Sequence, residues 1–290
     1  MPGTSPASVA TVPVDPELKL GTELTELKQN LQTLADQVPG LTLATFLYDL
    51  DTQAYFNING SDPVASASMI KVPVLVAFLQ AVDGGTIALD EPLTMQPQQI
   101  ASGSGDFQVD PPGSVYSAFD TAAWMIINSD NTATNMIIDR LGGAEVVNAQ
   151  FQAWGLTDTV IRNPLPDLEG TNTTSPEDLV TLMAMLNRGD LLSLRSRDRL
   201  FSIMQRTYSD TLLPQGLSEA DLISHKTGDI GAMVGDVGVI DLSNGKRYAI
   251  AVMVERPHND GRAQELIRRV SASVHDQLAA PLKPTIPGGS

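Results

Sequence analysis

Residues 233–254 read MVGDVGVIDLSNGKRYAIAVMV, and this stretch decides how the chain folds. Two apolar runs, 233–242 and 247–254, flank Ser243-Asn244-Gly245, a short link typical of a tight β-hairpin. A further strand-like run at 222–226 precedes them. Residues 260–279 follow, with apolar side chains at the three- and four-residue spacing of an amphipathic helix. The C-terminal part therefore predicts three strands and a final helix.

The N-terminal part carries the complementary half of this pattern. Leucines spaced three and four apart over 16–37 predict an amphipathic helix, which Pro39-Gly40 ends. Two strand-like runs, 42–50 and 54–58, flank a short polar link and predict a second hairpin. The long middle of the chain, 68–207, is mostly helical in pattern and is broken by Gly and Pro loops.

These segments together predict an α/β fold. One antiparallel sheet is built from both ends of the chain, flanked by the N- and C-terminal helices, and an all-helical subdomain is inserted between its second and third strands. We expect a disordered tail at 1–14, an α/β sheet region at 15–66 plus 215–282, and a helical region at 67–214. The active site is expected in the cleft between the last two regions.

The composition excludes several classes of function. The 290 residues include 34 acidic and 18 basic side chains, and the net charge of −16 argues against nucleic acid or an anionic membrane as a partner. With no cysteine and three histidines, disulfides and thiol catalysis are excluded and a multi-histidine metal site nearly so. We therefore expect neither a metal nor a cofactor. No apolar run reaches the ~18 residues that a membrane-spanning helix needs.

The first of three motifs places a serine and a lysine together. Ser68 and Lys71 stand three residues apart at the start of a predicted helix, so they share one face. The lysine could take the serine proton if it were neutral, and a second cation nearby would help to keep it neutral. The backbone N–H of Ser68 could also form half of an oxyanion hole. Taken alone, this motif is equally compatible with a helix cap and a surface lysine.

The other two motifs add a hydroxyl, an amide and a second cation. Ser129-Asp130-Asn131 lies between two helical patterns, where it could also be an ordinary cap of the following helix. Lys226-Thr227-Gly228 ends a predicted strand. There Gly228 leaves room for a substrate backbone, and the N–H of Asp229 could complete the oxyanion hole.

In order and context, these motifs resemble the S-x-x-K, S-D-N and K-T-G set of the penicillin-recognising serine hydrolases. The chain resembles class A β-lactamases over about 16–280, a family whose fold joins an α/β sheet region to an all-α region with the site between them. The resemblance implies a role for each matching residue: Ser68 as the acylated nucleophile, Lys71 as a general base, Ser129 as the proton shuttle, Lys226 as an electrostatic anchor, Thr227 for the substrate carboxylate, Asn131 for the substrate amide, and the N–H groups of Ser68 and Asp229 as the oxyanion hole.

One departure from the family bears on function. Class A β-lactamases carry a Glu two residues after an Arg in the loop that follows the helical region, and this Glu activates the water that clears the acyl-enzyme. Here the loop after Arg162 is shorter, and Pro164 stands at that position with Leu165 beside it. Asp167 and Glu169 are the carboxylates in reach, and their ordinary interpretation is as solvated loop charges. We expect Leu165, held between two prolines, to face the acyl ester.

A short loop without this Glu resembles the cyanobacterial penicillin-binding protein A group of D,D-peptidases. We therefore expect a serine D,D-peptidase that acts on D-Ala-D-Ala stem peptides of peptidoglycan, binds β-lactams and deacylates slowly. Two alternatives remain open: a β-lactamase with Asp167 or Glu169 as a relocated base, and a binding module that senses β-lactams or muropeptides. The expected location is the periplasm or cell envelope, with the signal or anchor outside this chain. The acyl acceptor and the oligomeric state are left open.

Overall fold

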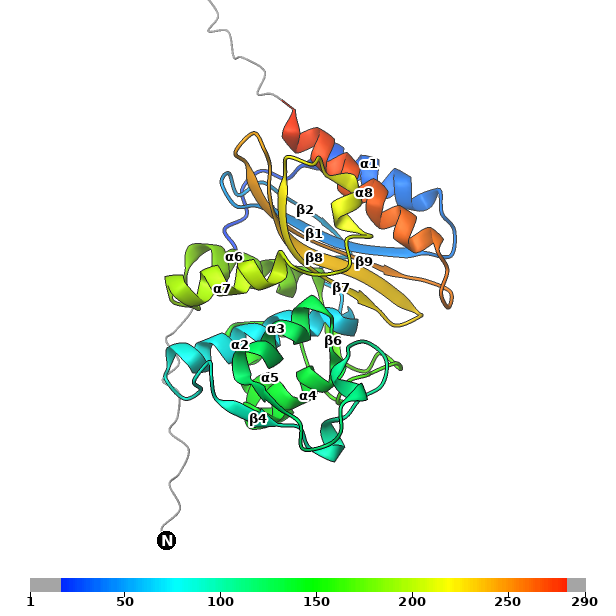
Figure 1. The fold of residues 1–290 in the computed structure, drawn as a ribbon. Coiled ribbons are helices and arrows are strands. Elements are labelled where there is room, and N and C mark those ends of the chain that lie inside the picture. The colour runs from blue at the N-terminus through cyan, green and yellow to red at the C-terminus, as the bar shows by residue number, and fades with distance from the viewer. Residues whose placement is uncertain (1–16, 281–290) are drawn as a thin grey trace, which may run out of the picture.

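The centre of the structure is a five-stranded antiparallel sheet in the order β2-β1-β9-β8-β7 (Figure 1). The computed structural model describes residues 17–280, so the predicted tail at 1–14 lies outside the described residues. The strands come from both ends of the chain: β1 Thr42–Asp49, β2 Tyr55–Ile58, β7 Leu222–Asp229, β8 Met233–Asp241 and β9 Arg247–Glu255. The predicted α/β fold with one antiparallel sheet is confirmed.

The hairpin between β8 and β9 has the tight turn that its sequence predicts. Leu242 donates its backbone N–H to the oxygen of Lys246 over 2.8 Å. Gly245 has φ 89°, a left-handed conformation that glycine adopts without steric cost. Strand β1 then pairs with β9, with Leu43 opposite Val254, and this pairing joins the two ends of the chain. Strand β7 is left at the edge of the sheet.

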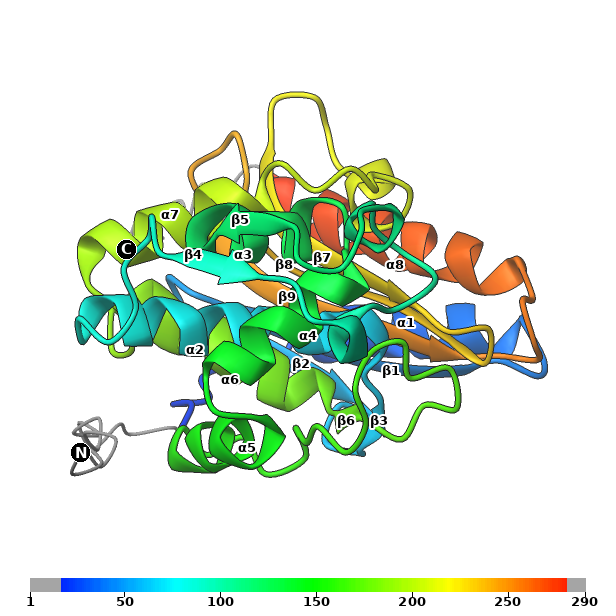
Figure 2. The same cartoon turned by 60° about the horizontal axis from the view of Figure 1, so that its bottom comes forward.

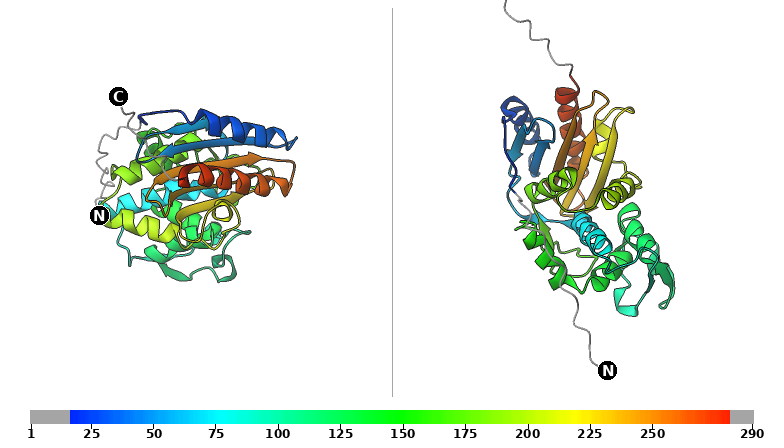
Figure 3. Two further views of the ribbon diagram at one scale, coloured as in Figure 1. Left: turned by 90° about the horizontal axis from the view of Figure 1, so that it is seen from above. Right: turned by 90° about the vertical axis from the view of Figure 1, so that its left-hand side faces the viewer.

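Helices cover both faces of the sheet, which explains why β1, β8 and β9 are buried on both of their faces. Helices α1 (Thr25–Asp36) and α8 (Arg262–Ala279) pack together on one face, and α6 (Pro176–Arg188) packs on the other. Figure 3 shows α8 lying along the sheet beside α1. Along β1, Leu43 belongs to the core beneath α1 and α8, whereas Phe46 belongs to the core shared with the helical region. The sheet is therefore the middle layer of three.

The predicted helix over 16–37 is wrong in its first half. Residues 17–24 form no helix, and α1 begins only at Thr25. Gly21 donates its N–H to the oxygen of Gln53 over 2.9 Å, and Leu24 donates to Tyr55 over 2.7 Å. This segment therefore follows the edge of β2, and the backbone hydrogen bonds it makes there replace those of a helix.

The helical region lies between β2 and β7 in the sequence, and in space it lies on the face of the sheet that α6 covers (Figure 2). Its other helices are α2 Lys71–Asp83, α3 Ala118–Ile127, α4 Asn131–Arg140, α5 Ala144–Ala153 and α7 Leu194–Met204. Four short 3₁₀ helices accompany them within the described chain: η1 Ala67–Ile70, η2 Pro97–Gln99, η3 Phe107–Val109 and η4 Leu213–Gly216. Two small antiparallel strand pairs complete it: β3 Val64–Ala65 with β6 Thr173–Thr174, and β4 Pro92–Thr94 with β5 Val115–Ser117.

Helix α2 is the axis of this region, because it is buried on nearly all sides. A helix that is apolar all round is packed inside a protein rather than on its surface. Its first residue, Lys71, has an amine in its side chain instead of an apolar group, but it is also fully buried. Among residues 17–280, no helix is long and apolar enough to cross a membrane.

Candidate active site

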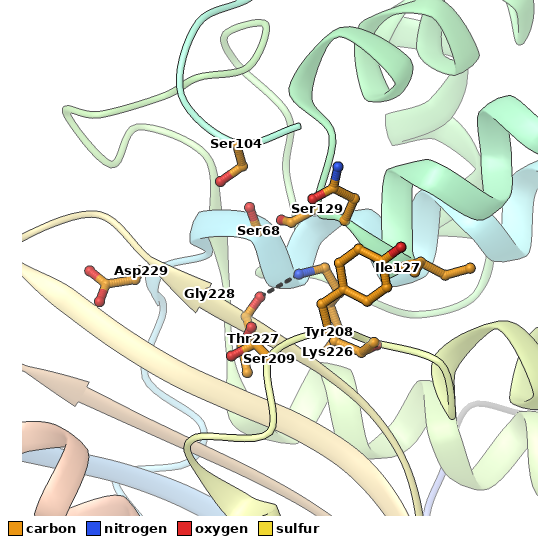
Figure 4. Close-up of a pocket in the computed structure, with 12 residues that line it drawn as sticks. Ser68, Ser104, Ile127, Ser129, Tyr208, Ser209, Lys226, Thr227, Gly228 and Asp229 are labelled. Carbon is orange, nitrogen blue, oxygen red and sulfur yellow. Dashed lines mark hydrogen bonds between the residues drawn. The ribbon is translucent and has the colours of Figure 1, made fainter. Parts of the chain in front are cut away.

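A cleft of about 240 Å³ lies where the edge strand β7 meets the start of α2 and the connection between α3 and α4. It brings together segments far apart in the sequence, and its lining residues are Ser68, Ser104, Ile127, Asn128, Ser129, Thr207, Tyr208, Ser209, Lys226, Thr227, Gly228 and Asp229. Figure 4 shows Ser68 and Ser129 close together above β7, with Lys226 rising from the strand toward them. All three motifs found in the sequence therefore contribute to one site.

Ser68 lies in η1, the 3₁₀ turn that leads into α2. In a 3₁₀ turn, residues three apart are eclipsed, so Ser68 and Lys71 lie one directly above the other. Lys71 closes this turn by donating its backbone N–H to the oxygen of Ser68. The residue before the serine, Ala67, has φ 43°, a conformation that a non-glycine residue adopts at a cost. Ser68 is partly exposed to the cleft.

Gly228 brings the edge of β7 against the start of this turn. A Cβ atom at Gly228 would lie 2.9 Å from the Cβ of Ala67 and 3.0 Å from the backbone nitrogen of Ser68. A side chain there would push the strand away from the serine. Gly228 also lines the cleft, so the expectation that it leaves room for a substrate backbone stays a prediction, while the space in the direction of its absent Cβ is filled by Ala67 and Ser68.

The backbone N–H of Asp229 points to the free edge of β7, on the side of Ser68. Backbone groups of successive strand residues point to alternate sides. Ile230 donates toward β8, to the oxygen of Met233 over 3.0 Å. His225 uses the outer edge, where its oxygen accepts from Thr207 Oγ1 over 2.9 Å. Asp229 is four residues after His225, so its backbone N–H faces the same outer edge of β7, beside the turn that carries Ser68.

Lys71 is fully buried, and its Nζ atom makes three hydrogen-bond contacts beneath the cleft. Nζ lies 2.6 Å from the backbone oxygen of Ser129, 2.8 Å from Asn131 Oδ1 and 3.1 Å from Ser129 Oγ. The carbonyl and amide oxygens can only accept hydrogen bonds, whereas the hydroxyl can also donate. A neutral amine would give its two protons to the two acceptors and turn its lone pair toward the hydroxyl of Ser129.

The environment of Lys71 favours this neutral form. Burial holds the pKa of Lys71 well below its ordinary value, and the positive charge of Lys226 lowers it further, while the carboxylate of Asp130 opposes both. The sequence prediction joined Lys71 to Ser68 directly, but the contacts of Nζ in the resting site go to Ser129 and Asn131. Catalytic hydrogen bonds are often long or poorly aligned before substrate binds.

Ser129 sits at the strained point of the connection between α3 and α4. Its φ is 54°, in the left-handed region. Asp130, the next residue, caps α4 by accepting from the N–H of Ala133 over 2.8 Å and accepts from Phe107 over 2.9 Å. The helix-cap interpretation of Ser129-Asp130-Asn131 is therefore correct for Asp130. The carboxylate of Asp130 thereby ties the start of α4 to the segment of Phe107, while Ser129 lines the cleft.

Asn131 lies below the cleft rather than in its wall. It is buried, accepts from Lys71 on Oδ1 and donates from Nδ2 to the oxygen of Ser102 over 3.0 Å. Asn131 therefore links Lys71 to the segment that carries Ser104 on the opposite wall. The contact with Ser102 uses one of the two Nδ2 protons of Asn131.

Lys226 supplies a buried positive charge on the β7 side of the cleft. Its Nζ donates to the oxygen of Thr227 over 2.7 Å (Figure 4). Burial lowers the pKa of Lys226 to about 8, and the carboxylate of Asp236 acts in the opposite direction. Asp236 lies on β8 and is itself 3.0 Å from Nδ1 of His225, within the sheet. Thr227 is partly exposed, so a carboxylate in the cleft can reach both its hydroxyl and the Lys226 charge.

The loop after Arg162 holds Leu165 by both of its backbone groups. Asn135 of α4 accepts from the N–H of Leu165 over 2.9 Å and donates to its oxygen over 2.8 Å. Leu165 is buried, and the peptide bond between Leu165 and Pro166 is cis. The end of the loop is joined to the residue before η1, because Ser66 donates its N–H to the oxygen of Asn172 over 2.8 Å.

The two carboxylates of this loop have different surroundings. Asp167 is buried, and both of its oxygens accept hydrogen bonds, one from Thr171 Oγ1 over 2.8 Å and one from the N–H of Asn172 over 2.6 Å. Its expected interpretation as a solvated charge is wrong, because Asp167 is a structural residue of the loop. Glu169 is exposed. Leu165, Asp167 and Glu169 do not line the cleft described above.

Sequence reasoning missed the segment 207–209 and Ser104, which form the far walls of the cleft. Tyr208 donates its N–H to the oxygen of Ile127 over 3.0 Å, and its exposed ring packs edge-on against Trp124 at 6.1 Å. Thr207 is bonded to β7, as described above. These residues carry no recognisable motif, and only the contacts of the folded chain reveal them.

Three comparisons with known proteins agree with this geometry. Residues 26–278 match the family model described as Beta-lactamase enzyme family. The chain is 24% identical over 238 residues to Beta-lactamase VEB-1 of Pseudomonas aeruginosa, an alignment that covers 76% of this chain and 80% of that protein. A solved structure of PBP-A is 53% identical, with a TM-score of 0.89, and the match covers 91% of this chain and 99% of that one.

A second PBP-A structure is a leucine-to-glutamate mutant, solved as an acyl-enzyme complex with penicillin G. It also has a TM-score of 0.89 and 53% identity, over 90% of this chain and 99% of that chain. These comparisons confirm the resemblance to class A β-lactamases and to the penicillin-binding protein A group that the three motifs predicted.

Proposed function

This chain belongs to the Beta-lactamase enzyme family, and we propose that within this family it is a serine D,D-peptidase. In this proposal it acts on D-Ala-D-Ala stem peptides of peptidoglycan, forms the same acyl-enzyme with β-lactams and releases the penicilloyl group slowly. It works in the periplasm or cell envelope and needs no cofactor.

The chemistry begins with the neutral amine of Lys71, which takes the proton of Ser68 as its oxygen attacks the substrate carbonyl. The N–H groups of Ser68 and Asp229 hold the oxyanion that forms. Ser129, which contacts Lys71 Nζ at 3.1 Å, passes the proton on to the leaving amine. The breakdown of the tetrahedral intermediate leaves an ester on Ser68 and frees D-alanine, or opens a β-lactam ring.

In this proposal, two parts of the site bind the substrate: the end of strand β7 and the start of helix α4. The buried charge of Lys226 and the hydroxyl of Thr227 bind the terminal carboxylate that stem peptides and β-lactams share. The remaining Nδ2 proton of Asn131 binds the amide of the acyl part.

The observation that carries the choice of a peptidase is the arrangement of the loop after Arg162. Asp167 is buried, uses its two oxygens to hold the loop and does not line the cleft, so it is not placed to take a proton from a water beside the ester. At Leu165, the position expected to face the ester, the side chain is apolar. A water beside the ester would lack a base, and general-base assistance is worth about 10²–10⁴-fold in rate. Glu169 is the carboxylate on which a β-lactamase would depend.

Intact-mass spectrometry after mixing with penicillin tests this proposal, together with D-alanine release from a D-Ala-D-Ala tripeptide and turnover of a chromogenic cephalosporin. The peptidase predicts one long-lived adduct per chain and release of D-alanine. An adduct that clears within seconds in the parent and persists in Glu169→Gln identifies a β-lactamase. A persistent adduct without any release of D-alanine identifies a sensing module.

A further inference from the structure

Asp229, the last residue of β7, forms an ion pair with an arginine outside the motifs. Nη2 of Arg256, which directly follows β9, donates to Oδ1 of Asp229. The Arg256 side chain is 1% exposed, whereas that of Asp229 is 48% exposed. Figure 4 shows the Asp229 carboxylate turned away from Ser68. The pair therefore joins a buried cation to a carboxylate at the rim of the cleft.

Arg256 also binds the turn that follows β7. Its Nε donates to the oxygen of Gly231 over 2.8 Å, and its backbone N–H donates to the oxygen of Ala232 over 2.8 Å. The N–H of Gly231 in turn donates to Asp229 Oδ1 over 3.1 Å. One arginine thus fixes both the carboxylate of Asp229 and the turn between β7 and β8.

The position of Asp229 makes its charge a problem for catalysis. Its backbone N–H is one of the two donors proposed to hold the oxyanion, so a carboxylate on the same residue lies near a developing negative charge. The carboxylate is half exposed and turned away from Ser68, so water weakens the repulsion between the two like charges, but at this short range it does not remove it. A cation paired to that carboxylate cancels most of its field.

We propose that Arg256 is a positioning residue for acylation, which neutralises the Asp229 carboxylate beside the oxyanion hole. The inference rests on the proposed role of Ser68 as nucleophile, and it holds whether the acyl-enzyme is cleared slowly or quickly. The alternative is that Arg256 only staples the turn between β7 and β8, without any electrostatic effect on the reaction.

The electrostatic role and the purely structural role of Arg256 predict different effects of a second substitution. In Arg256→Gln the carboxylate is left uncompensated, and the first-order acylation rate constant at saturating chromogenic cephalosporin should fall about 10–100-fold. Adding Asp229→Asn to this variant removes the repelling charge and should restore the rate constant to within a few-fold of the parent. If Arg256 is only a staple, the double variant stays as slow as Arg256→Gln or becomes slower.

Arg262→Gln is the matched control, because Arg262 is an exposed arginine paired with Asp260 in the same segment. It should acylate within about twofold of the parent. Arg256→Lys covers the case in which Arg256→Gln does not fold: it keeps the charge but not the bond to Gly231, and it should stay within a few-fold of the parent. Parent-like acylation in Arg256→Gln, absence of rescue in the double variant, or a 10-fold loss in Arg256→Lys would overturn the inference. A parent that is not acylated at all would instead contradict the proposed function.

Discussion

Lys71 Nζ lies 2.6 Å from the backbone oxygen of Ser129, so the proposed base of one motif is anchored on the proposed proton shuttle of another. The left-handed conformation of Ser129 belongs to the same arrangement, and strained residues of this kind persist only where their surroundings hold them. The hydrogen bond from the buried Lys71 amine helps to hold Ser129 in this conformation. The turn that carries Ser68 and the connection between α3 and α4 therefore support each other's conformation.

Replacing the nucleophile should abolish acylation without unfolding the protein. Ser68→Ala removes the attacking oxygen, so penicillin should add no mass to this variant, whereas the parent should gain one penicilloyl group per chain. Ser243→Ala is the control, because Ser243 and Lys246 repeat the serine–lysine spacing in the hairpin turn, away from the cleft. Intact mass and circular dichroism check both variants. Labelling that survives in Ser68→Ala would contradict the assignment.

Replacing Lys71 by a permanently charged side chain should remove the base. The guanidinium of Arg cannot give up its proton, so Lys71→Arg should lower the acylation rate by about 10²–10⁴-fold. The larger side chain must also fit a fully buried site, so thermal unfolding is measured in parallel. A folded variant that acylates within a few-fold of the parent would exclude proton transfer through Lys71.

The acylation rate should depend on pH through both lysines. Lys226 has a pKa of about 8, so it carries its charge below that pH and loses its grip on the substrate carboxylate as the pH rises above it. Lys71 acts in the opposite sense, because its lowered pKa makes it neutral and active, and acid protonates it. The second-order acylation rate should therefore rise and then fall with pH.

The variant Lys226→Arg separates the alkaline fall of the acylation rate, the alkaline limb of the pH profile, from its rise at acid pH, the acid limb. The guanidinium stays charged, so the alkaline fall at about pH 8 should move upward by at least about one pH unit while the acid limb stays in place. Stopped-flow acylation over about pH 5–10 measures both limbs. An alkaline limb that is identical in the two proteins would assign it to another group.

The sequence predicted the two hairpins of the sheet well, because in each of them the residue pattern and the turn agree. The apolar runs around Ser243-Asn244-Gly245 became β8 and β9 almost to the residue. The start of α1 was missed for a physical reason: leucines before Thr25 fit the helical spacing, but the segment bonds to the edge of β2 instead. Such a competing partner is a tertiary contact that periodicity does not contain.

The site was predictable to the extent that its residues stand in short motifs. Spacing and helix context placed Ser68 and Lys71 together, but Tyr208 reaches the cleft only because its N–H bonds to the oxygen of Ile127. Arg256 was missed in the same way, since its contact with Asp229 joins residues 27 apart in the chain. Long-range contacts of single residues leave no local pattern to detect.

Removing the clamp on Leu165 should destabilise the protein. Asn135→Ala leaves the N–H and the oxygen of Leu165 without their partner in a buried site, and each buried unsatisfied group costs about 1–3 kcal/mol. We expect the free energy of unfolding to fall by about 2 kcal/mol or more, measured by urea denaturation. Asn163→Ala is the control in the same loop, because the Asn163 side chain is exposed. An equal loss of unfolding free energy in both variants would show that the two hydrogen bonds between Asn135 and Leu165 stabilise the protein no more than an exposed side chain of the loop does.

Supplying the missing base at Leu165 should convert slow release into turnover. A Glu at this position would be held in direction by the Asn135 clamp on its backbone, and burial would raise the pKa of its carboxyl, as suits a general base near neutral pH. Leu165→Glu should therefore speed penicilloyl-enzyme hydrolysis at least about tenfold, followed by mass spectrometry in single turnover. Leu165→Gln has the same size and burial cost without the base, and it should leave the hydrolysis rate near that of the parent. If the Gln variant speeds hydrolysis as much as the Glu variant, loosening of the loop rather than proton transfer is the cause, and the position of the deacylating water must lie elsewhere.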